Sequence, residues 1–304
     1  TEHAGEMTAI LCVLVGLSTY AAALWRESPL VAQPTQAAML FEVHGTPVQH
    51  KPVLFTHLHK SGGTTMCSMA RAAGERVFGT AKDKHNCNYW GEWIDGWARR
   101  GEDRSRITCE NRLRVMKEHN KTWSQIETQI GPGDVCPGDF INIIVLREPI
   151  SRLLSFMNYK FDGPLPSASP ESINACLSQG IHCIGNNGVF NAQQLDNFIT
   201  RTLAGGSAWE VDYGGLNSTH FEAAKARLSM YDIVLTLESL NDARANKMLD
   251  AALGWHVVMK PCNTGTGLYE FSAKSREALA GINHYDLELY QHALEKLNIG
   301  ATKL

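Results

Sequence analysis

Short apolar runs alternate with longer mixed segments along the chain after residue 50. Val53-Leu-Phe is one such run, and Ile141 to Leu146 is another. Runs of this length are typical of strands buried on both faces of a parallel sheet, and the segments between them are long enough for helices. The pattern predicts strands near residues 52–57, 112–117, 141–146 and 231–237. It predicts helices near residues 64–77, 149–160, 219–230, 241–253 and 284–298.

Strands that alternate with helices in this way predict a three-layer α/β domain, in which helices cover both faces of a central, mostly parallel sheet. Ligands of such domains bind at the carboxyl ends of the strands. The residues that follow residue 50 are numerous enough for one large core. The segment from Phe161 to Gly188 is rich in Pro, Gly and Ser and is predicted to form a loop or lid over the site.

The first predicted strand leads into a turn with the composition of a phosphate site, His59-Lys-Ser-Gly-Gly-Thr-Thr65. The two glycines permit close approach of the backbone to an anion. The N–H groups at the start of the next helix, with the two threonine hydroxyls, form a pocket that suits a phosphate or sulfate. Lys60 adds a positive charge. An ordinary strand-to-helix turn, whose glycines serve only geometry, is the alternative.

A second predicted strand delivers an arginine to the start of a helix. Arg147 follows the run that ends at Leu146, Pro149 suits the first turn of a helix, and Ser155 lies about two turns into it. The fork of an arginine suits bidentate contacts with a phosphate, and a serine hydroxyl adds a hydrogen bond. Taken alone, this pattern is also typical of a surface arginine at the end of a strand, followed by a serine that packs on a helix. Together with the first turn, it predicts a nucleotide site.

The two segments together resemble a known family, the membrane-bound, Golgi-type sulfotransferases that use 3'-phosphoadenosine 5'-phosphosulfate. His59-Lys-Ser-Gly-Gly-Thr-Thr65 is similar to their 5'-phosphosulfate loop, and Leu146-Arg-Glu-Pro-Ile-Ser-Arg-Leu-Leu-Ser155 is similar to their 3'-phosphate motif. Residues 195–205, 220–240 and 282–290 are similar to downstream elements. The resemblance implies metal-free transfer of a sulfuryl group to an acceptor hydroxyl or amine. The residues that it assigns to the donor are Lys60, Ser61, Gly62, Gly63, Thr64, Thr65, Arg147 and Ser155.

Sulfuryl transfer needs positive charge near the transferring group and a base near the attacking atom. Lys60 is expected to supply the charge. The predicted strand at residues 112–117 is expected to end beside the nucleotide, which makes Glu118 and His119 the candidate bases. Neighbouring side chains on a strand point to opposite faces, so only one of the two is expected to reach the acceptor. His57 and His59 flank the loop and are weaker candidates.

The N-terminal part of the chain is predicted to contain a tail, an anchor and a stem. Residues 1–6 form the tail, and residues 7–25 are an uncharged run that, as a helix, would span roughly 28 Å and cross the apolar core of a bilayer. The proline-containing residues 26–50 form the stem before a catalytic domain at residues 51–304. The resemblance implies a single-pass signal-anchor in the Golgi membrane with a lumenal catalytic domain. A cleaved signal peptide is the alternative.

The chain contains eight cysteines and no CxxC spacing, which is typical of disulfides in a secretory compartment rather than of a zinc site. Cys176 and Cys183 can close a short loop. Four other cysteines can pair in several ways: Cys87, Cys109, Cys136 and Cys262. Cys67 is then predicted to be the odd thiol. Asn120-Lys-Thr and Asn217-Ser-Thr are glycosylation sequons.

The net charge of −3 gives no indication of a nucleic-acid partner. Basic residues outnumber acidic ones between residues 99 and 117, which indicates either a strip for an anionic acceptor or a solvated face. Trp90, Trp93 and Trp97 recur at helix-like spacing, as a core stripe or as a platform for a sugar ring. With the resemblance, the tryptophans favour a carbohydrate acceptor. The pattern does not indicate an oligomeric state.

Two other functions are compatible with part of the pattern. A P-loop small-molecule kinase would also use Lys60 and a glycine turn. However, the chain contains no Gly-Lys dipeptide and therefore no GxxxxGK[ST] loop, and no Asp can be assigned to magnesium. A non-catalytic lumenal binding protein on the same fold is the second alternative, because a fold does not fix a function. The presence of Lys60, Arg147 and Ser155 favours an enzyme.

Overall fold

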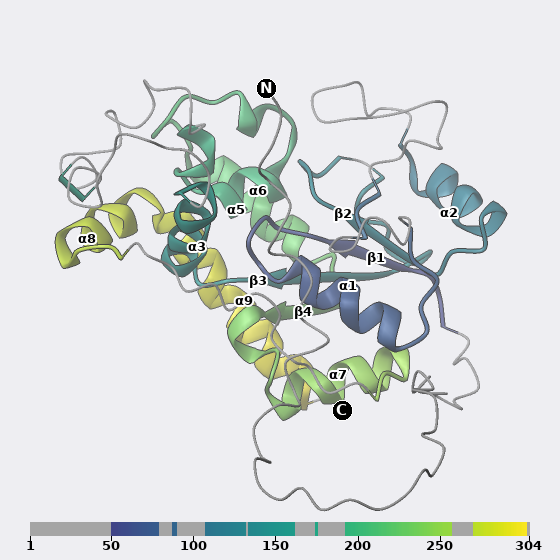
Figure 1. The fold of residues 1–304 in the computed structure, drawn as a ribbon. Helices are drawn as coiled ribbons and strands as arrows, with labels where there is room; N and C mark the ends of the chain where they lie inside the picture. Colours follow the sequence, from purple (N-terminus) through teal and green to yellow (C-terminus); the bar gives the residue numbers. More distant parts are fainter. Residues whose placement is uncertain are drawn as a thin grey trace, which may run out of the picture.

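The computed structural model describes residues 50–78, 87–89, 107–131, 133–161, 174–175, 192–256 and 270–302. Within them, four parallel strands form one sheet in the order β2-β1-β3-β4 (Figure 1). The strands are β1 (Val53–Thr56), β2 (Trp123–Ile126), β3 (Ile141–Leu146) and β4 (Ile233–Thr236). The predicted α/β class with a parallel sheet is confirmed, and the strands predicted near residues 52–57, 141–146 and 231–237 are present.

The helices predicted from the sequence are also present. They are α1 (Gly63–Ala72), α3 (Pro149–Phe161), α6 (Ser218–Leu228), α7 (Ala243–Leu253) and α9 (His284–Thr302). Helix α1 ends earlier than predicted because Gly74, with a φ of 85°, turns the chain out of the helix. The structure adds α2 (Cys109–Glu118), α5 (Phe198–Ala204), α8 (Ala273–Ile282) and the short 3₁₀ helices η3 (Ala192–Gln194), η4 (Gly206–Trp209) and η5 (Leu237–Ser239).

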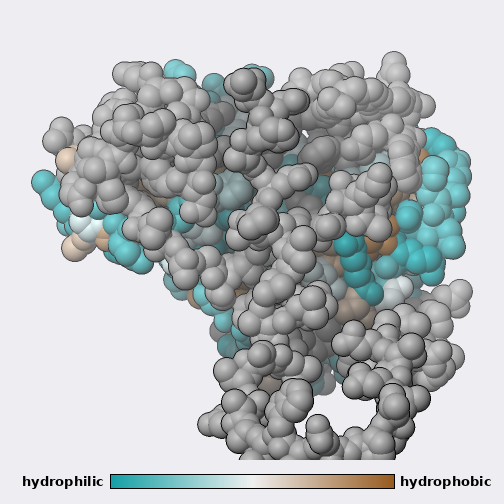
Figure 2. Space-filling view, viewed as in Figure 1, coloured by the Kyte–Doolittle hydropathy of each residue, from teal (hydrophilic) through white to brown (hydrophobic). Residues whose placement is uncertain are grey.

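The strand predicted at residues 112–117 is wrong, because this segment belongs to helix α2. The Thr108 side chain accepts a hydrogen bond from the Asn111 N–H and so caps the helix start. The buried residues Arg112, Val115 and Met116 recur at the i, i+3, i+4 spacing of a helix face. Figure 2 shows a hydrophilic patch over α2. The neighbour of β1 in the sheet is instead β2, which lies further along the chain.

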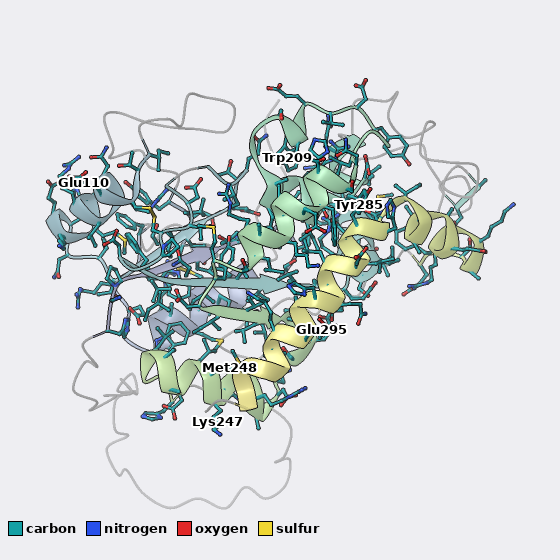
Figure 3. The ribbon with its side chains drawn as sticks, turned by 180° about the vertical axis from the view of Figure 1, so that it is seen from behind. Glu110, Trp209, Lys247, Met248, Tyr285 and Glu295 are labelled. Atoms are coloured by element: carbon teal, nitrogen blue, oxygen red, sulfur yellow. A yellow bond between two sulfur atoms is a disulfide. The ribbon has the colours of Figure 1, made fainter. Side chains whose placement is uncertain are left out.

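Alternate residues of the strands contribute to two different cores. In β3, Ile143 and Val145 belong to the core beneath α1 and α7, whereas Ile144 and Leu146 belong to the core beneath α5 and α6. Figure 3 shows α9 running across the back of the sheet, from the side of α5 and α6 to α7, on which Met248 is labelled. Helices therefore cover both faces of the parallel sheet, which is compatible with the predicted three layers.

The strand order changes direction next to β1. The chain passes from β1 to β2 on one side of β1 and then enters β3 on its other side. The register pairs Thr56 with Ile126 on one side and with Ile144 on the other, so the carboxyl ends of β1, β2 and β3 lie at the same edge of the sheet. Open α/β sheets bind ligands at such a switch point.

Two disulfides join described residues, Cys67 to Cys87 and Cys109 to Cys136, each with its Cα atoms 5.5 Å apart. The prediction that Cys67 is the odd thiol is therefore wrong. Both bonds are consistent with a secreted or lumenal protein, because disulfides persist in oxidising compartments.

Several predicted features lie outside the described residues. They include the N-terminal tail and anchor, nearly all of the stem, most of the predicted lid, the tryptophans at residues 90, 93 and 97, and Cys176, Cys183 and Cys262. Among the helices that the structure describes, none is long and apolar enough to cross a bilayer.

Candidate active site

The turn between β1 and α1 has an unusual backbone. Lys60 has a φ of 68° and Gly62 a φ of 85°, both in the left-handed region. The Ser61 N–H donates to the Leu58 carbonyl at 3.0 Å and closes the turn. No side chain of the described residues caps the start of α1, and the first turn of this helix contains no acidic residue. The N–H groups at the helix start are therefore available to an anion.

The surroundings require a glycine at position 63, and a φ of 85° favours one at position 62. A Cβ atom on Gly63 would lie 2.0 Å from Nε2 of His57, and one on Gly62 would lie 2.8 Å from Cδ1 of Leu237. The buried imidazole of His57 thus packs directly beneath the turn. Burial lowers the pKa of His57, because desolvation of the imidazolium outweighs the attraction of the nearby Glu127. His57 is therefore a neutral imidazole at neutral pH.

The Ser61 side chain is fully buried in this turn, and its hydroxyl makes no hydrogen bond to any described residue. A buried hydroxyl without a partner costs about 1–3 kcal/mol. Unsatisfied polar groups and left-handed backbone at non-glycine residues both concentrate at ligand sites, where a ligand completes the hydrogen bonds. The turn therefore has the features of a site formed for a bound anion.

The second predicted motif meets the first in the structure. Nη1 of Arg147, directly after β3, donates to the carbonyl oxygen of Lys60 at 3.2 Å. Burial lowers the pKa of Arg147, while the carboxylates of Glu238 and Glu148 oppose this shift. The guanidinium remains charged, because arginine does not lose its proton in proteins. The Glu148 carboxylate accepts hydrogen bonds from two N–H groups in the first turn of α3 and so caps that helix.

Helix α3 packs its second turn against the loop. The His59 ring lies edge-on to Phe156 and Tyr159, with ring centroids 5.5 Å and 5.7 Å away. Nζ of Lys60 lies 4.3 Å from the centroid of the Tyr159 ring, and this ring is 55% exposed. Ser155 is half-buried on the same turn of α3. The structure therefore brings Lys60, Arg147 and the helix turn that contains Ser155 to one edge of the sheet.

A group of side chains that sequence reasoning missed lies at the end of β2. The backbone N–H of His57 donates to the Ile126 carbonyl at 2.8 Å, which places Glu127 beside His57. Nδ2 of Asn88 donates to Oε2 of Glu127 at 2.6 Å, and Oδ1 of Asn88 lies 3.2 Å from Nδ1 of His57. Buried Gln125 lies beneath them, with Nε2 3.2 Å from the same imidazole nitrogen. Glu127 directly follows β2, a strand that the sequence pattern did not predict.

Glu118 and His119, the candidate bases from the sequence, lie at the end of helix α2. Both are exposed, and Glu118 forms an ion pair with Arg114 at 2.9 Å. They were expected beside the nucleotide because they would end a strand, and that strand is absent. Their role as a base stays a prediction, to be tested beside Glu127.

The described residues contain no group of three His, Cys, Asp or Glu side chains that could hold a metal ion. The sequence matches no protein-family model and shows no significant similarity to a curated protein. The chemistry of the site is therefore inferred from its own residues. An uncapped helix start, a buried hydroxyl without a partner among the described residues, a lysine and a half-buried arginine suit a ligand with two anionic groups, and Glu127 adds a carboxylate nearby.

Proposed function

We propose that the chain is a sulfotransferase, which transfers a sulfuryl group from 3'-phosphoadenosine 5'-phosphosulfate to an acceptor hydroxyl. The observation that supports this most directly is the hydrogen bond from Arg147 to the Lys60 carbonyl. It joins two anion-binding motifs that are 87 residues apart in the sequence, and it does so at the switch point of the sheet. One bisphosphorylated donor would engage both motifs.

Each motif would bind one end of the donor. The loop from Lys60 to Thr65 would hold the 5'-phosphosulfate with its backbone N–H groups and hydroxyls, and the Ser61 hydroxyl would gain a partner there. Arg147 and Ser155 would hold the 3'-phosphate, because a guanidinium makes charge-assisted bonds to phosphate oxygens. No metal is needed for either contact.

In the proposed step, the acceptor oxygen attacks sulfur while the bond between sulfur and the bridging phosphate oxygen breaks. The leaving bisphosphate takes the electron pair of that bond, and Lys60 offsets the negative charge that develops there. The acceptor proton passes to a base, for which Glu127 is our first choice. The Glu127 side chain is 14% exposed and is therefore accessible to an acceptor. It lies beside His57, the residue that follows β1.

The base is tested by Glu127→Gln, Glu118→Gln and His119→Ala, made separately. Loss of a general base lowers kcat by about 100-fold or more while binding of the bisphosphate product remains. We expect this result for Glu127→Gln, with Glu222→Gln on the exposed face of α6 as the matched control. Full activity of Glu127→Gln, with loss in one of the other two variants, would return the role to Glu118 or His119.

Thermal shift measurements test the donor class. Adenosine 3',5'-bisphosphate is expected to raise the melting temperature more than ATP with magnesium, because only the former has a phosphate for Arg147 at the 3' position. Preference for ATP with magnesium would indicate a kinase. Binding of the bisphosphate without transfer to any acceptor would indicate a non-catalytic binding protein.

We further propose a carbohydrate hydroxyl as the acceptor and the Golgi lumen as the compartment, with residues 7–25 as the anchor. The two disulfides support an oxidising compartment. Asn120 and Asn217 of the two sequons are exposed, as glycosylation requires. An acceptor array with labelled sulfate donor tests this proposal, and labelling confined to peptides or small phenols would overturn it.

A further inference from the structure

Residues 87–89 add a short piece of backbone beside β2. Asn88 forms a parallel bridge with Gln125, and the Tyr89 N–H donates to the Gln125 carbonyl at 2.6 Å. This pairing places the Asn88 side chain at the same edge of the sheet as the ends of β1 and β2. The side chain thereby reaches both Glu127 and His57.

The hydrogen bonds of Asn88 have a defined direction. An ionised carboxylate only accepts hydrogen bonds, so the contact to Glu127 at 2.6 Å requires the amide NH₂ of Asn88 on that side. The amide oxygen then faces Nδ1 of His57 at 3.2 Å, and Nε2 of Gln125 lies 3.2 Å from the same nitrogen. Burial lowers the pKa of His57, so the imidazole that Asn88 contacts is neutral at neutral pH. The Asn88 amide thus joins His57 to Glu127.

A disulfide ties this side chain to the anion-binding loop. Cys87, directly before Asn88, is bonded to Cys67 in α1, the helix that begins at the loop. Both cysteines are buried in the core beneath α1. The covalent bond therefore limits how far Asn88 can move relative to the donor site.

We propose that Asn88 is a positioning residue for Glu127 and that the Cys67–Cys87 disulfide holds it in place. This inference rests on the proposed function, in which Glu127 is the base. Asn88 does not touch the reacting atoms. It restricts the rotation of the Glu127 carboxylate through the hydrogen bond at 2.6 Å. The disulfide links base and donor loop, so that both keep the geometry that transfer requires.

The first test is Asn88→Ala, with the exposed Asn241→Ala as the matched control. Asn88→Ala is expected to lower kcat by roughly 10- to 100-fold, because the Glu127 carboxylate loses the amide hydrogen bond that orients it. The dissociation constant of adenosine 3',5'-bisphosphate is expected to stay within about 3-fold of wild type, since Asn88 contacts neither anion motif. A kcat equal to wild type overturns the proposal.

Asn88→Asp supplies a readout that a merely structural role would not move. The charged groups known to face the new carboxylate are Glu127, His57 when protonated, and Lys60, which lies close enough to His57 to lower its pKa. A second negative charge beside Glu127 raises the pKa of that carboxyl. In the proposed mechanism, kcat requires ionised Glu127 and therefore falls at acid pH. In Asn88→Asp, this fall of kcat is expected to occur at higher pH than in wild type. An unchanged pH dependence of kcat would contradict the proposal.

The disulfide is tested by Cys67→Ala/Cys87→Ala, with Cys109→Ala/Cys136→Ala as the matched control. The first variant is expected to lose kcat to about the level of Asn88→Ala, while bisphosphate affinity remains. Combined with Asn88→Ala, it is expected to add no further loss, because both changes release the same carboxylate. If the double cysteine variant fails to fold, the folded wild-type and Asn88→Ala proteins are each reduced briefly with dithiothreitol. The loss of kcat on reduction is then compared between the two proteins. Additive losses overturn the link.

Nitrogen NMR of labelled histidine separates this inference from the proposed function. The nitrogen chemical shifts of His57 are expected to differ between wild type and Asn88→Ala, because the Asn88 amide contacts Nδ1, whatever reaction the protein performs. If wild type transfers sulfate and Glu127→Gln is inactive, but the Asn88 variants are normal, only the inference fails. If wild type neither binds the bisphosphate nor transfers sulfate, the proposed function fails, and the positioning role fails with it.

Discussion

Helices α1 and α5 begin in opposite ways. The first N–H groups of α5 are satisfied from inside the protein by buried Asp286, which accepts from the Ile199 N–H at 2.9 Å and the Thr200 N–H at 2.7 Å. No described side chain satisfies the start of α1, and the Ser61 hydroxyl beside it has no partner within the same part of the chain. The difference indicates that the α5 start serves the fold alone, whereas the α1 start is kept for a ligand.

Five other described helices support this contrast. Side chains of Thr108, Glu148, Asn217, Asp242 and Ser272 accept hydrogen bonds at the starts of α2, α3, α6, α7 and α8. At these five starts, the chain supplies its own acceptor. Changes at α5 should therefore cost stability, and changes around α1 should cost binding or turnover.

The largest effect is expected at the α5 start. Asp286→Ala leaves two buried N–H groups without acceptors and removes a carboxylate whose charge favours buried Arg152. The free energy of unfolding is expected to fall by about 3–5 kcal/mol, measured by urea denaturation. Asp286→Asn keeps an acceptor and is expected to lose less. A loss below about 1 kcal/mol for the alanine variant would remove the contrast.

Lys60→Ala is expected to act on turnover. If the ammonium offsets charge on the leaving phosphate, kcat should fall by about 100- to 1,000-fold, with a smaller change in donor affinity. Steady-state kinetics and bisphosphate titration measure the two quantities separately. Equal losses in both would mean that Lys60 binds the ground state and the transition state alike.

Arg147→Ala is expected to weaken donor binding by roughly 1.5–3 kcal/mol, the value of a hydrogen bond to a charged group. The informative comparison uses a donor that lacks the 3'-phosphate. Wild type should strongly prefer the complete donor, and the variant should have lost most of this preference. Ser155→Ala should show the same change more mildly. An alanine variant that still discriminates fully would make Arg147 a structural residue.

Ser61→Ala is expected to leave the stability of the ligand-free protein unchanged or slightly higher, because it removes a buried hydroxyl that has no partner among the described residues. Bisphosphate affinity is expected to fall by about 1 kcal/mol. Thermal unfolding with and without the ligand measures both. A destabilised ligand-free protein would show that the hydroxyl already serves the fold.

The smallest effect concerns pH. Burial lowers the pKa of His57 below its usual 6.5, so the unfolded chain binds a proton at a pH where the folded protein does not. This group's contribution to stability is present above pH 6.5 and is lost as the pH falls through the folded pKa. His57→Gln should therefore flatten the acid side of the stability profile. An unchanged profile would place the neutral imidazole in doubt.

The sequence predicted the parts of the site whose signal is local. β1 and β3 are continuous apolar runs, and the turn and the arginine follow them directly, so both motifs were identified. In the structure, Arg147 donates to the carbonyl oxygen of Lys60, so the two motifs lie side by side, and their joint role as a nucleotide site stays a prediction. Helix α2 was misread because its buried face includes Arg112, a charged residue that pairs with buried Asp134.

The parts that were missed depend on distant partners. β2 contains Ser124 and Gln125, both fully buried, so its run did not resemble an apolar strand. Glu127 was overlooked for that reason. Asn88 lies in no regular element and reaches the site only because residues 87–89 pair with β2. The partner of Cys67 likewise follows from packing, since spacing alone permits several pairings.

The register of the central strands also has a consequence for how the chain assembles. β1 pairs with β3 through Val53 and Ile141, which lie far apart along the chain. The entropy cost of closing this long loop therefore comes before the stabilising contacts between the two strands. Because Arg147 contacts Lys60 only after that closure, the proposed bisphosphate site would form late in folding. The ligand would then select completed molecules, and its presence during refolding should raise the yield of native protein.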